Sequence, residues 1–236
     1  MTHRFFLNQK LDRELIVVKD RALVHQIRDV LKIRKGERVA FFNSDAEEAG
    51  YDFISELRNI DSGMAVFMLR EKMENKRAPT KKIILFQALI KKDKFEWVLE
   101  KGTEIGISEF VPVIASRSEK KSINRARSEL ILKEASEQSG RAAIPRLHNE
   151  ISFDRAAALA QNSGNKTYFA DFSEKENMVR GAGDRAINLF IGPEGGWEER
   201  ELYVAGRAGF EVISLGRLTL RSETASVVAS YTLLWG

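Results

Sequence analysis

Cysteine is absent from the 236 residues of this chain, and histidine occurs only three times. The lack of cysteine excludes a disulfide scaffold, a thiol nucleophile and thiolate metal ligands, and it fits a reducing compartment. The histidines His3, His25 and His148 lie far apart, and none belongs to a His-Glu-x-x-His motif. We therefore expect no bound metal. A Gly-x-Ser-x-Gly nucleophile elbow is also missing.

Long apolar segments are missing too. The longest apolar stretch, Ile83–Ile90, is interrupted by Gln87, and the first residues contain no apolar run of signal-peptide length. We therefore expect no membrane contact and no secretion, and a cytoplasmic protein. With 43% hydrophobic and 31% charged residues, the chain has a globular composition that can build a sizeable core.

The formal net charge of +4 is unevenly distributed. Residues 1–40 carry a net charge of +5, residues 79–146 again +5, and residues 147–236 carry −3. Two basic segments favour a polyanionic partner for the first two thirds of the chain. A solvated surface with uneven charge would give the same pattern.

The first 70 residues contain short segments with alternating, β-branched or aromatic residues, which predict strands. The expected strands are Arg4–Leu7, Leu15–Val18, Arg38–Phe42, Tyr51–Leu57 and Met64–Leu69, with one helix at Ala22–Leu31. Such a set is typical of a small barrel-like module. The next segment, Glu71–Pro79, is charged, non-periodic and ends in proline, which indicates a linker.

Strands and helices alternate in the remaining residues. The expected strands are Lys82–Leu89, Phe110–Ile114, Thr167–Ala170, Ile187–Ile191 and Phe210–Ser214; the expected helices are Ser128–Ser139, Phe153–Gln161, Glu198–Ala208, Ser222–Leu234 and one capped by Asp93. This alternation predicts an α/β domain on a mainly parallel sheet. The chain therefore reads as two domains.

One strand leads directly into the glycine-rich loop Ile191–Trp197, after which a helix begins. Glycines let the backbone approach a ligand closely, and a helix N-terminus offers free N–H groups. The loop matches neither the Gly-x-Gly-x-x-Gly fingerprint nor a P-loop, so it predicts no nicotinamide or nucleoside-triphosphate site. Taken alone, a tight structural loop explains it equally well.

A second loop of this kind covers Ser214–Ala225. Arg221 and Glu223 flank Ser222, a good N-cap residue, so a capped helix with a surface ion pair is one interpretation. The two loops follow strand ends about twenty residues apart, and ligands bind beyond the carboxyl ends of strands in open α/β sheets. The pair therefore favours a shared ligand pocket.

Five motifs occur in an order and spacing that together are highly specific. They are Gly192–Gly196; Leu215-Gly216 with Leu220–Ala225; Glu134–Ser139 with Arg141 and Pro145; Glu100–Gly106; and an opening set of Arg4–Phe6, His25 and Val30–Glu37. In these motifs nearly the whole chain resembles the RsmE-type 16S ribosomal RNA uracil-N3 methyltransferases of the SPOUT superfamily. It departs from them at Arg217, shifted by one position, at Lys32, where the family has arginine, and at Lys91–Asp93, where the family commonly has Lys-Gly-Asp.

The resemblance implies a PUA-like RNA-binding β-barrel at residues 1–70, a linker at 71–79, and at 80–236 a SPOUT methyltransferase domain with a trefoil knot. It also implies a homodimer that uses S-adenosyl-L-methionine and acts on 16S rRNA of the small ribosomal subunit. A related enzyme that methylates ribose 2′-OH or another base remains an alternative, as does a non-catalytic ribosome-assembly factor that binds RNA.

The resemblance also assigns residues to roles. The cofactor-binding residues would be Ile191, Gly192, Pro193, Glu194, Gly195, Gly196, Leu215, Gly216, Leu218, Leu220 and Arg221. Methylation of uracil N3 requires an unstacked base that loses its N3 proton, so cationic groups would stabilise the anion. Arg221 and Arg4 are candidates for that role, and Glu223 is a candidate base or orienting residue. The RNA-binding residues would be Arg4, Arg28, Lys32, Arg34, Lys35, Arg117, Lys120, Lys121, Arg125, Arg127 and Arg141.

Overall fold

The computed structural model describes residues 2–45, 47–172, 177 and 183–236. It divides into two compact units. Unit 1 comprises Met1–Ala78 and Ser136–Ile144, and unit 2 comprises Pro79–Ala135 and Pro145–Gly236. Among the described residues, no helix combines the length and the apolar character that a membrane crossing requires.

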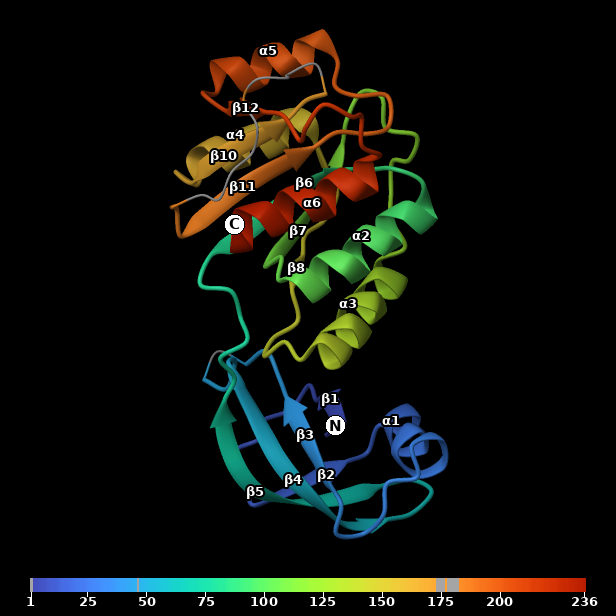
Figure 1. Ribbon diagram of the computed structural model, residues 1–236. Helices are drawn as coiled ribbons and strands as arrows, with labels where there is room; N and C mark the ends of the chain where they lie inside the picture. Colours follow the sequence, from blue (N-terminus) through green and yellow to red (C-terminus); the bar gives the residue numbers. More distant parts are fainter. Residues whose placement is uncertain (1, 46, 173–176, 178–182) are drawn as a thin grey trace. The chain divides into compact units, whose positions relative to one another are not determined.

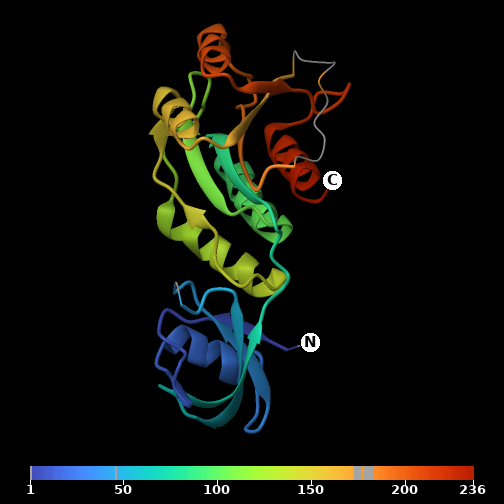
Figure 2. The same ribbon diagram turned by 90° about the vertical axis from the view of Figure 1, so that its left-hand side faces the viewer.

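Unit 1 is built on a curled five-stranded sheet (Figures 1 and 2). Its strands are β1 (Arg4–Phe6), β2 (Leu15–Val18), β3 (Arg38–Phe42), β4 (Tyr51–Ile60) and β5 (Ala65–Glu74), in the order β1-β3-β4-β5-β2. β1 pairs with β3 in parallel, and the other pairs are antiparallel. Two register shifts in the β4–β5 ladder mark bulges, which increase local twist and favour curling.

The core of unit 1 is rich in aromatic side chains. Phe5, Phe41, Phe53 and Phe67 are buried, and the rings of Phe41 and Phe67 meet edge to face with centroids 4.8 Å apart. These residues come from the inward-facing positions of four strands, as the period of two in a half-buried strand requires. The five predicted strands are therefore confirmed, with β4 and β5 longer than expected.

The helix predicted at Ala22–Leu31 has two parts. The α-helix α1 covers Arg21–His25, and a π-helical segment, η1, covers Gln26–Val30. The Leu31 N–H donates to the Gln26 carbonyl at 2.9 Å, a five-residue step that widens the turn. Periodicity alone does not reveal such a change of helix type.

The predicted linker also differs from the structure. Its first four residues, Glu71–Glu74, continue β5 and pair with β4, because backbone hydrogen bonding extends the strand beyond its apolar part. The segment 136–144, far away in sequence, packs with the strands of unit 1. Asn75 Nδ2 donates to the Gly140 carbonyl, and the Phe6 N–H donates to Glu137 Oε1.

Unit 2 contains a seven-stranded sheet in which every recorded strand pair is parallel. Its strands are β6 (Lys82–Ala88), β7 (Glu109–Ile114), β8 (Arg146–Leu147), β9 (Ile151–Ser152), β10 (Lys166–Ala170), β11 (Ala186–Ile191) and β12 (Glu211–Ile213). The order is β12-β10-β11-β6-β7-β8, and β9 also pairs with β7. The mainly parallel α/β sheet predicted from the sequence is confirmed, whereas the two-residue strands β8 and β9 were too short to show a pattern.

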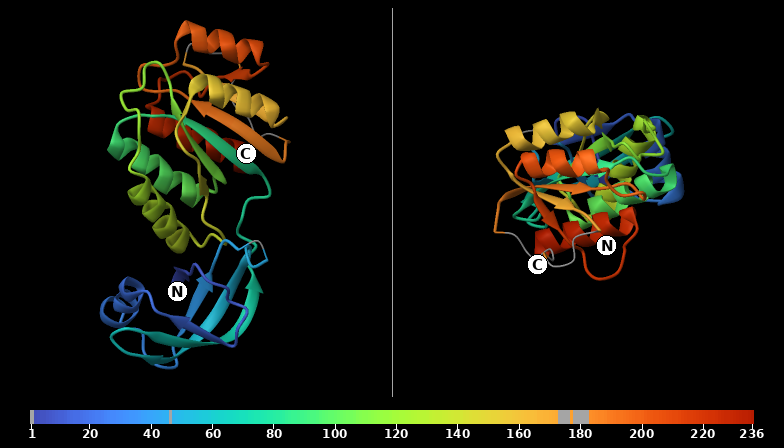
Figure 3. Two further views of the ribbon diagram at one scale, coloured as in Figure 1. Left: turned by 180° about the vertical axis from the view of Figure 1, so that it is seen from behind. Right: turned by 90° about the horizontal axis from the view of Figure 1, so that it is seen from above.

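Helices cover both faces of this sheet. They are α2 (Lys92–Ile105), α3 (Arg125–Ser139), α4 (Phe153–Asn162), α5 (Glu199–Arg207) and α6 (Ser222–Trp235), and the last turn of α3 belongs to unit 1. Figure 3 shows α4 and α6 on opposite faces. The α4 face holds a buried aromatic cluster in which Phe86 and Phe190 stack 4.4 Å apart.

The predicted Asp93 cap of α2 is wrong. The N-cap residue is Lys91, whose side chain makes no capping bond, and Asp93 lies inside the first turn. A carboxylate in that position interacts favourably with the positive end of the helix dipole, so the acidic residue fits the helix start without capping it.

Candidate functional site

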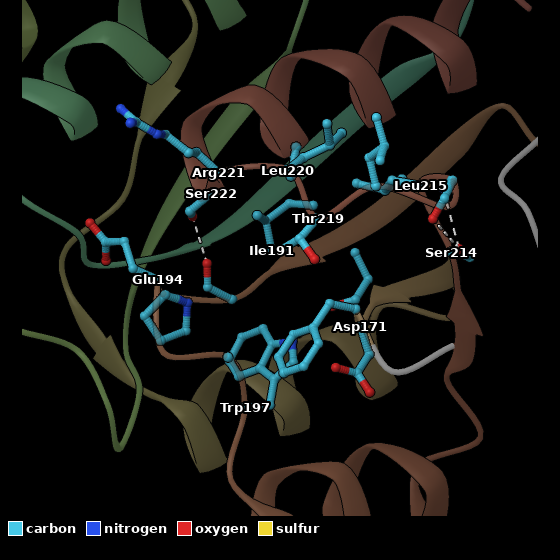
Figure 4. A pocket seen from close by; sticks show the side chains of 18 of the residues that line it. Asp171, Ile191, Glu194, Trp197, Ser214, Leu215, Thr219, Leu220, Arg221 and Ser222 are labelled. Carbon is cyan, nitrogen blue, oxygen red and sulfur yellow. Dashed lines mark hydrogen bonds between the residues drawn. The ribbon is translucent and has the colours of Figure 1, made fainter. Parts of the chain in front are cut away.

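A cavity of about 670 Å³ opens at the carboxyl edge of the sheet in unit 2 (Figure 4). Its walls come from the segments after β10, β11 and β12 and from the start of α6. The lining residues are Ala170–Phe172, Ile191–Glu194, Gly196, Trp197, Ser214–Arg221, Ser222 and Ala225. The two loops singled out in the sequence therefore line one cavity, and Gly195 is the only predicted cofactor residue outside this lining.

Two glycines allow the loops to turn as they do. Gly196 has φ = 70° and Gly216 has φ = 119°, the left-handed region that favours glycine. A Cβ on Gly196 would lie 2.3 Å from Cε1 of Phe172, so this position also requires the absence of a side chain. Open space surrounds Gly216, where the turn alone requires glycine.

Ser222 joins the two loops. Its hydroxyl donates to the Gly192 carbonyl at 2.6 Å and accepts from Gln87 Nε2 at 3.1 Å. The hydroxyl of Ser226 donates to Oε1 of the same glutamine, which is fully buried at the end of β6. The N-cap residue of α6 is Arg221, so the predicted capping role of Ser222 is wrong: its hydroxyl instead satisfies a carbonyl 30 residues earlier.

Trp197 forms one wall of the cavity and was not among the predicted site residues. Its Nε1–H donates to the Ala170 carbonyl at 3.0 Å, and its ring lies 4.6 Å from that of Phe169. A Cβ on Gly192 would come within 3.1 Å of the indole. The sequence signal was its position directly after the glycines. Asp171 and Phe172, also unpredicted, carry no local signal beyond following a strand.

Arg221 and Glu223 face different surroundings. The guanidinium of Arg221 is exposed, lies at the cavity rim away from Trp197 and Asp171 (Figure 4), and has no hydrogen-bond or ion-pair partner in the described part of the chain. Glu223 is buried outside the lining and lies 3.3 Å from Nζ of Lys94. The expected surface ion pair between Arg221 and Glu223 is therefore absent from the described residues, because Lys94 of α2 takes the carboxylate.

Arg4 is buried within unit 1. Its Nη2 lies 2.6 Å from Asp52 Oδ1, and it also donates to the carbonyls of Ser136 and Arg141. The guanidinium stacks 4.5 Å from the centre of the Phe42 ring. Arg141, a predicted RNA-binding residue, is largely buried, and burial lowers the pKa of its guanidinium to about 10. Arg4 of β1 thus connects the strands of unit 1 to the segment 136–144, which contains Arg141.

The remaining predicted RNA-binding residues fall in two groups. In unit 1, Arg28 donates two hydrogen bonds to the carboxylate of Asp29. Lys32 has φ = 53°, and Arg34 and Lys35 are exposed. The hydrogen bond from Arg28 lowers the pKa of Asp29 to about 2.

The second group lies in unit 2. The side chain of Arg117 donates to the Gly195 carbonyl. Arg125 and Arg127 pair with Glu129 and Glu96 respectively, whereas Lys120 and Lys121 are exposed. In the described residues no group of His, Asp or Glu is arranged to hold a metal ion.

The cavity suits a ligand that combines a flat apolar part with polar groups. Ile191, Leu215 and Leu220 supply aliphatic surface, and the indole of Trp197 supplies an aromatic face. The turn at Gly216 supplies peptide groups that face open space, whereas the Phe172 ring lies against Gly196. A few polar groups in a mainly apolar concave site are typical of small-ligand pockets, and the volume lies within their usual range.

Comparison with known proteins gives a consistent result. A family model described as an RNA methyltransferase domain matches residues 76–234. The ribosomal RNA small subunit methyltransferase E of Mesomycoplasma hyopneumoniae is 31% identical over 164 residues, which are 66% of this chain and 71% of that protein. The protein of the same name from Rickettsia conorii is 27% identical over 234 residues, 96% of this chain and 93% of that protein.

A solved structure is also similar. It is the crystal structure of a ribosomal RNA small subunit methyltransferase E from Neisseria gonorrhoeae bound to S-adenosyl methionine. Its TM-score is 0.85 at 27% sequence identity, and the match covers 98% of this chain and 95% of that one. The chain belongs to the RNA methyltransferase family, among the ribosomal RNA small subunit methyltransferase E proteins.

Proposed function

We propose that this protein methylates N3 of a uracil in 16S rRNA of the small ribosomal subunit, with S-adenosyl-L-methionine as the methyl donor. The observation that carries the proposal is the single cavity lined by both the glycine loop after β11 and the loop after β12. Two relatives named as small-subunit rRNA methyltransferases, and a similar structure with bound S-adenosyl methionine, support the same activity.

The donor set fits this cofactor. Ile191, Leu218 and Leu220 would contact its adenine, and backbone groups of Gly192–Gly196 and Leu215-Gly216 would bind its polar atoms. Glu194 and Arg221 would bind polar groups of the cofactor at the rim of the cavity. When bound, the cofactor supplies a methyl group on a positively charged sulfur, which is activated for direct transfer to nitrogen.

The residues of this chain would supply positioning and charge. Uracil N3 becomes nucleophilic as its proton leaves, and negative charge then spreads over O2 and O4. We assign the guanidinium of Arg221, which has no partner in the described part of the chain, to stabilising that charge, because a preorganised cation at a developing anion lowers the barrier. We assign Glu223, held by Lys94, to orienting the start of α6. For Arg4 to stabilise the same charge, its contacts with Asp52 and with the carbonyls of Ser136 and Arg141 would have to open.

The domain organisation and the knot also belong to the proposal. The curled sheet of unit 1 would be a PUA-like barrel that binds RNA through Arg28, Lys32, Arg34 and Lys35. Residues 75–79 would be the linker, and residues 80–236, apart from the segment 136–144 that packs in unit 1, would be the SPOUT domain. A trefoil knot is supported by the path of the chain from β12, at the sheet edge, to α6, which packs on β6 and β11 in the middle.

A homodimer is supported by the outer face of α6. Val228, Tyr231 and Trp235 lie at helical spacing and are 39%, 56% and 52% exposed. Apolar residues grouped on one helix face in this way are typical of a surface that another protein covers. Sedimentation velocity of the purified protein tests the dimer.

A ribosomal substrate would also place the protein in the cytoplasm.

Two experiments test the function. Calorimetric titration of the purified protein with S-adenosylmethionine is expected to show saturable binding; no heat of binding would reject the enzyme and favour an RNA-binding assembly factor. Mass analysis of rRNA from a strain that lacks the protein should show loss of one N3-methyluridine in 16S rRNA. If that base were unchanged and a ribose or another base lost its methyl group, the substrate assignment would be wrong.

A further inference from the structure

The turn after β7 is held in a fixed shape. The Ala115 N–H donates to the hydroxyl of Ser118 at 3.1 Å, and the Ser118 N–H donates back to the Ala115 carbonyl at 3.1 Å. These reciprocal bonds close a four-residue turn at the carboxyl edge of the sheet. Arg117 lies within this turn, so its backbone position is well determined.

A buried carboxylate connects this turn to the helix that follows the glycine loop. Glu201 is 0% exposed and accepts from the Ser116 N–H at 2.9 Å through one oxygen. Its other oxygen accepts from the Glu198 N–H, also at 2.9 Å. A buried carboxylate needs such donors, and it thereby fixes the backbone before Arg117 and at the start of α5 relative to each other.

The side chain of Arg117 then reaches the outside of the glycine loop. Its Nη1 donates to the Gly195 carbonyl at 2.7 Å, and its Nε lies 4.0 Å from Glu198 Oε1. A Cβ on Gly195 would lie 3.3 Å from Cδ of Arg117. Gly195 is also the predicted cofactor residue that does not line the cavity, whereas Gly192 and Trp197 do.

We propose that Arg117 is a positioning residue for the methyl donor: it fastens the outer surface of the glycine loop so that the inner surface keeps the shape that receives the cofactor. This inference rests on the proposed function and assigns Arg117 a role other than phosphate binding. It also gives Gly195 a different reason to be glycine, namely the close approach of Arg117.

The test compares cofactor affinity and RNA affinity. Arg117→Ala should weaken binding of S-adenosylmethionine, measured calorimetrically without RNA, by about 5-fold, because a charge-assisted hydrogen bond at a half-exposed site is lost. Arg207→Ala is the matched control, since it removes an exposed arginine of α5 and leaves the bond between Arg117 and Gly195 in place. A residue that only contacts phosphate would leave this affinity unchanged and raise the KM for RNA, and that result would overturn the proposal.

Two further variants separate positioning from a general loss of stability. Gly195→Ala should weaken cofactor binding to a similar degree, and the double variant with Arg117→Ala should be no worse than either single one, because both remove the same contact. Arg117→Lys should recover part of the affinity, since an ammonium retains one donor for the carbonyl. Additive losses, or no recovery with lysine, would contradict the proposal.

A readout without any cofactor completes the test. Amide hydrogen exchange of residues 192–198 should be faster in Arg117→Ala than in the wild-type protein or in Arg207→Ala. If the wild-type protein bound no S-adenosylmethionine, the proposed function would fail, while unchanged exchange in this segment would reject the fastening role by itself.

Discussion

The hydroxyl of Ser222 donates to the carbonyl of Gly192 at 2.6 Å, and this bond joins the two loops that line the cavity. The same hydroxyl accepts from Gln87, whose amide is buried at the end of β6. The start of α6, the glycine loop and the central strand of the sheet therefore share one hydrogen-bond network. The shape of the cavity depends on that network, because its hydrogen bonds hold the two loops in fixed positions relative to each other.

Ser222→Ala should weaken S-adenosylmethionine binding about tenfold and lower the melting temperature by a few degrees. The substitution removes the donor to the Gly192 carbonyl and the acceptor for the buried Gln87 amide, and an unsatisfied buried group costs about 1–3 kcal/mol. Calorimetry and thermal unfolding measure the two effects.

Ser230→Ala is the matched control for that variant. The Ser230 hydroxyl lies on the same helix, is buried and has no hydrogen-bond partner among the residues that the structure describes. Its removal should leave both the affinity and the melting temperature close to the wild-type values. Equal effects of the two substitutions would mean that the bond between Ser222 and Gly192 has no special role.

Arg221→Ala should lower the rate of methyl transfer far more than it weakens cofactor binding, which loses only a contact at the cavity rim. The guanidinium has no partner among the described residues, so its loss leaves no buried group unpaired. A missing cation near the developing uracil anion costs about 10²–10³ in kcat, by analogy with the loss of one oxyanion donor. Single-turnover methylation of 16S rRNA measures this rate.

Arg217→Ala serves for comparison, because Arg217 also lines the cavity. Its removal should change the rate much less than the removal of Arg221. A nearly normal rate in Arg221→Ala together with a large loss in Arg217→Ala would exchange the roles of the two arginines, and it would account for the shifted arginine of this loop.

Asp29 should titrate well below the ordinary range for aspartate. Its pKa is about 2, chiefly because Arg28 donates hydrogen bonds to it. Since this pKa is lower in the folded than in the unfolded chain, the stabilisation is complete above about pH 4 and is lost as the pH falls towards 2. Arg28→Ala should raise the pKa of Asp29 towards about 3.9, as NMR titration of its carboxyl carbon would show. An unchanged value would assign the effect to another group.

The extent to which the sequence predicts this molecule follows from the range of each interaction. The strands β3 and β11 are predictable to within one residue because alternation and continuous apolar runs are local signals. That two glycine-containing loops line one cavity follows from their positions after parallel strands. The partners of Ser222, Glu223 and Arg4 are different: they lie 30 or more residues away and leave no periodic pattern.

Arg4 illustrates that limit. An arginine in an opening motif suits either catalysis or RNA binding, and only the folded chain brings it onto Asp52 and the carbonyls of the segment 136–144. The helix η1 shows the same limit: it ends at Val30 and is followed by Lys32 in a left-handed conformation, which composition does not specify.

Arg4→Ala should lower the stability of unit 1 by about 3 kcal/mol, because removal of one member of a buried ion pair leaves the other charge with fewer donors. The side chains of Arg4 and Asp52 are 7% and 16% exposed, so solvent does not replace the lost bonds. Urea unfolding, followed by far-UV circular dichroism, measures the loss of stability. Arg4→Lys should recover only part of it, since an ammonium cannot reach Asp52 and two carbonyls at once. If instead Arg4→Ala kept full stability and lost methyl transfer with intact cofactor binding, Arg4 would be catalytic and its buried contacts would have to open during the reaction.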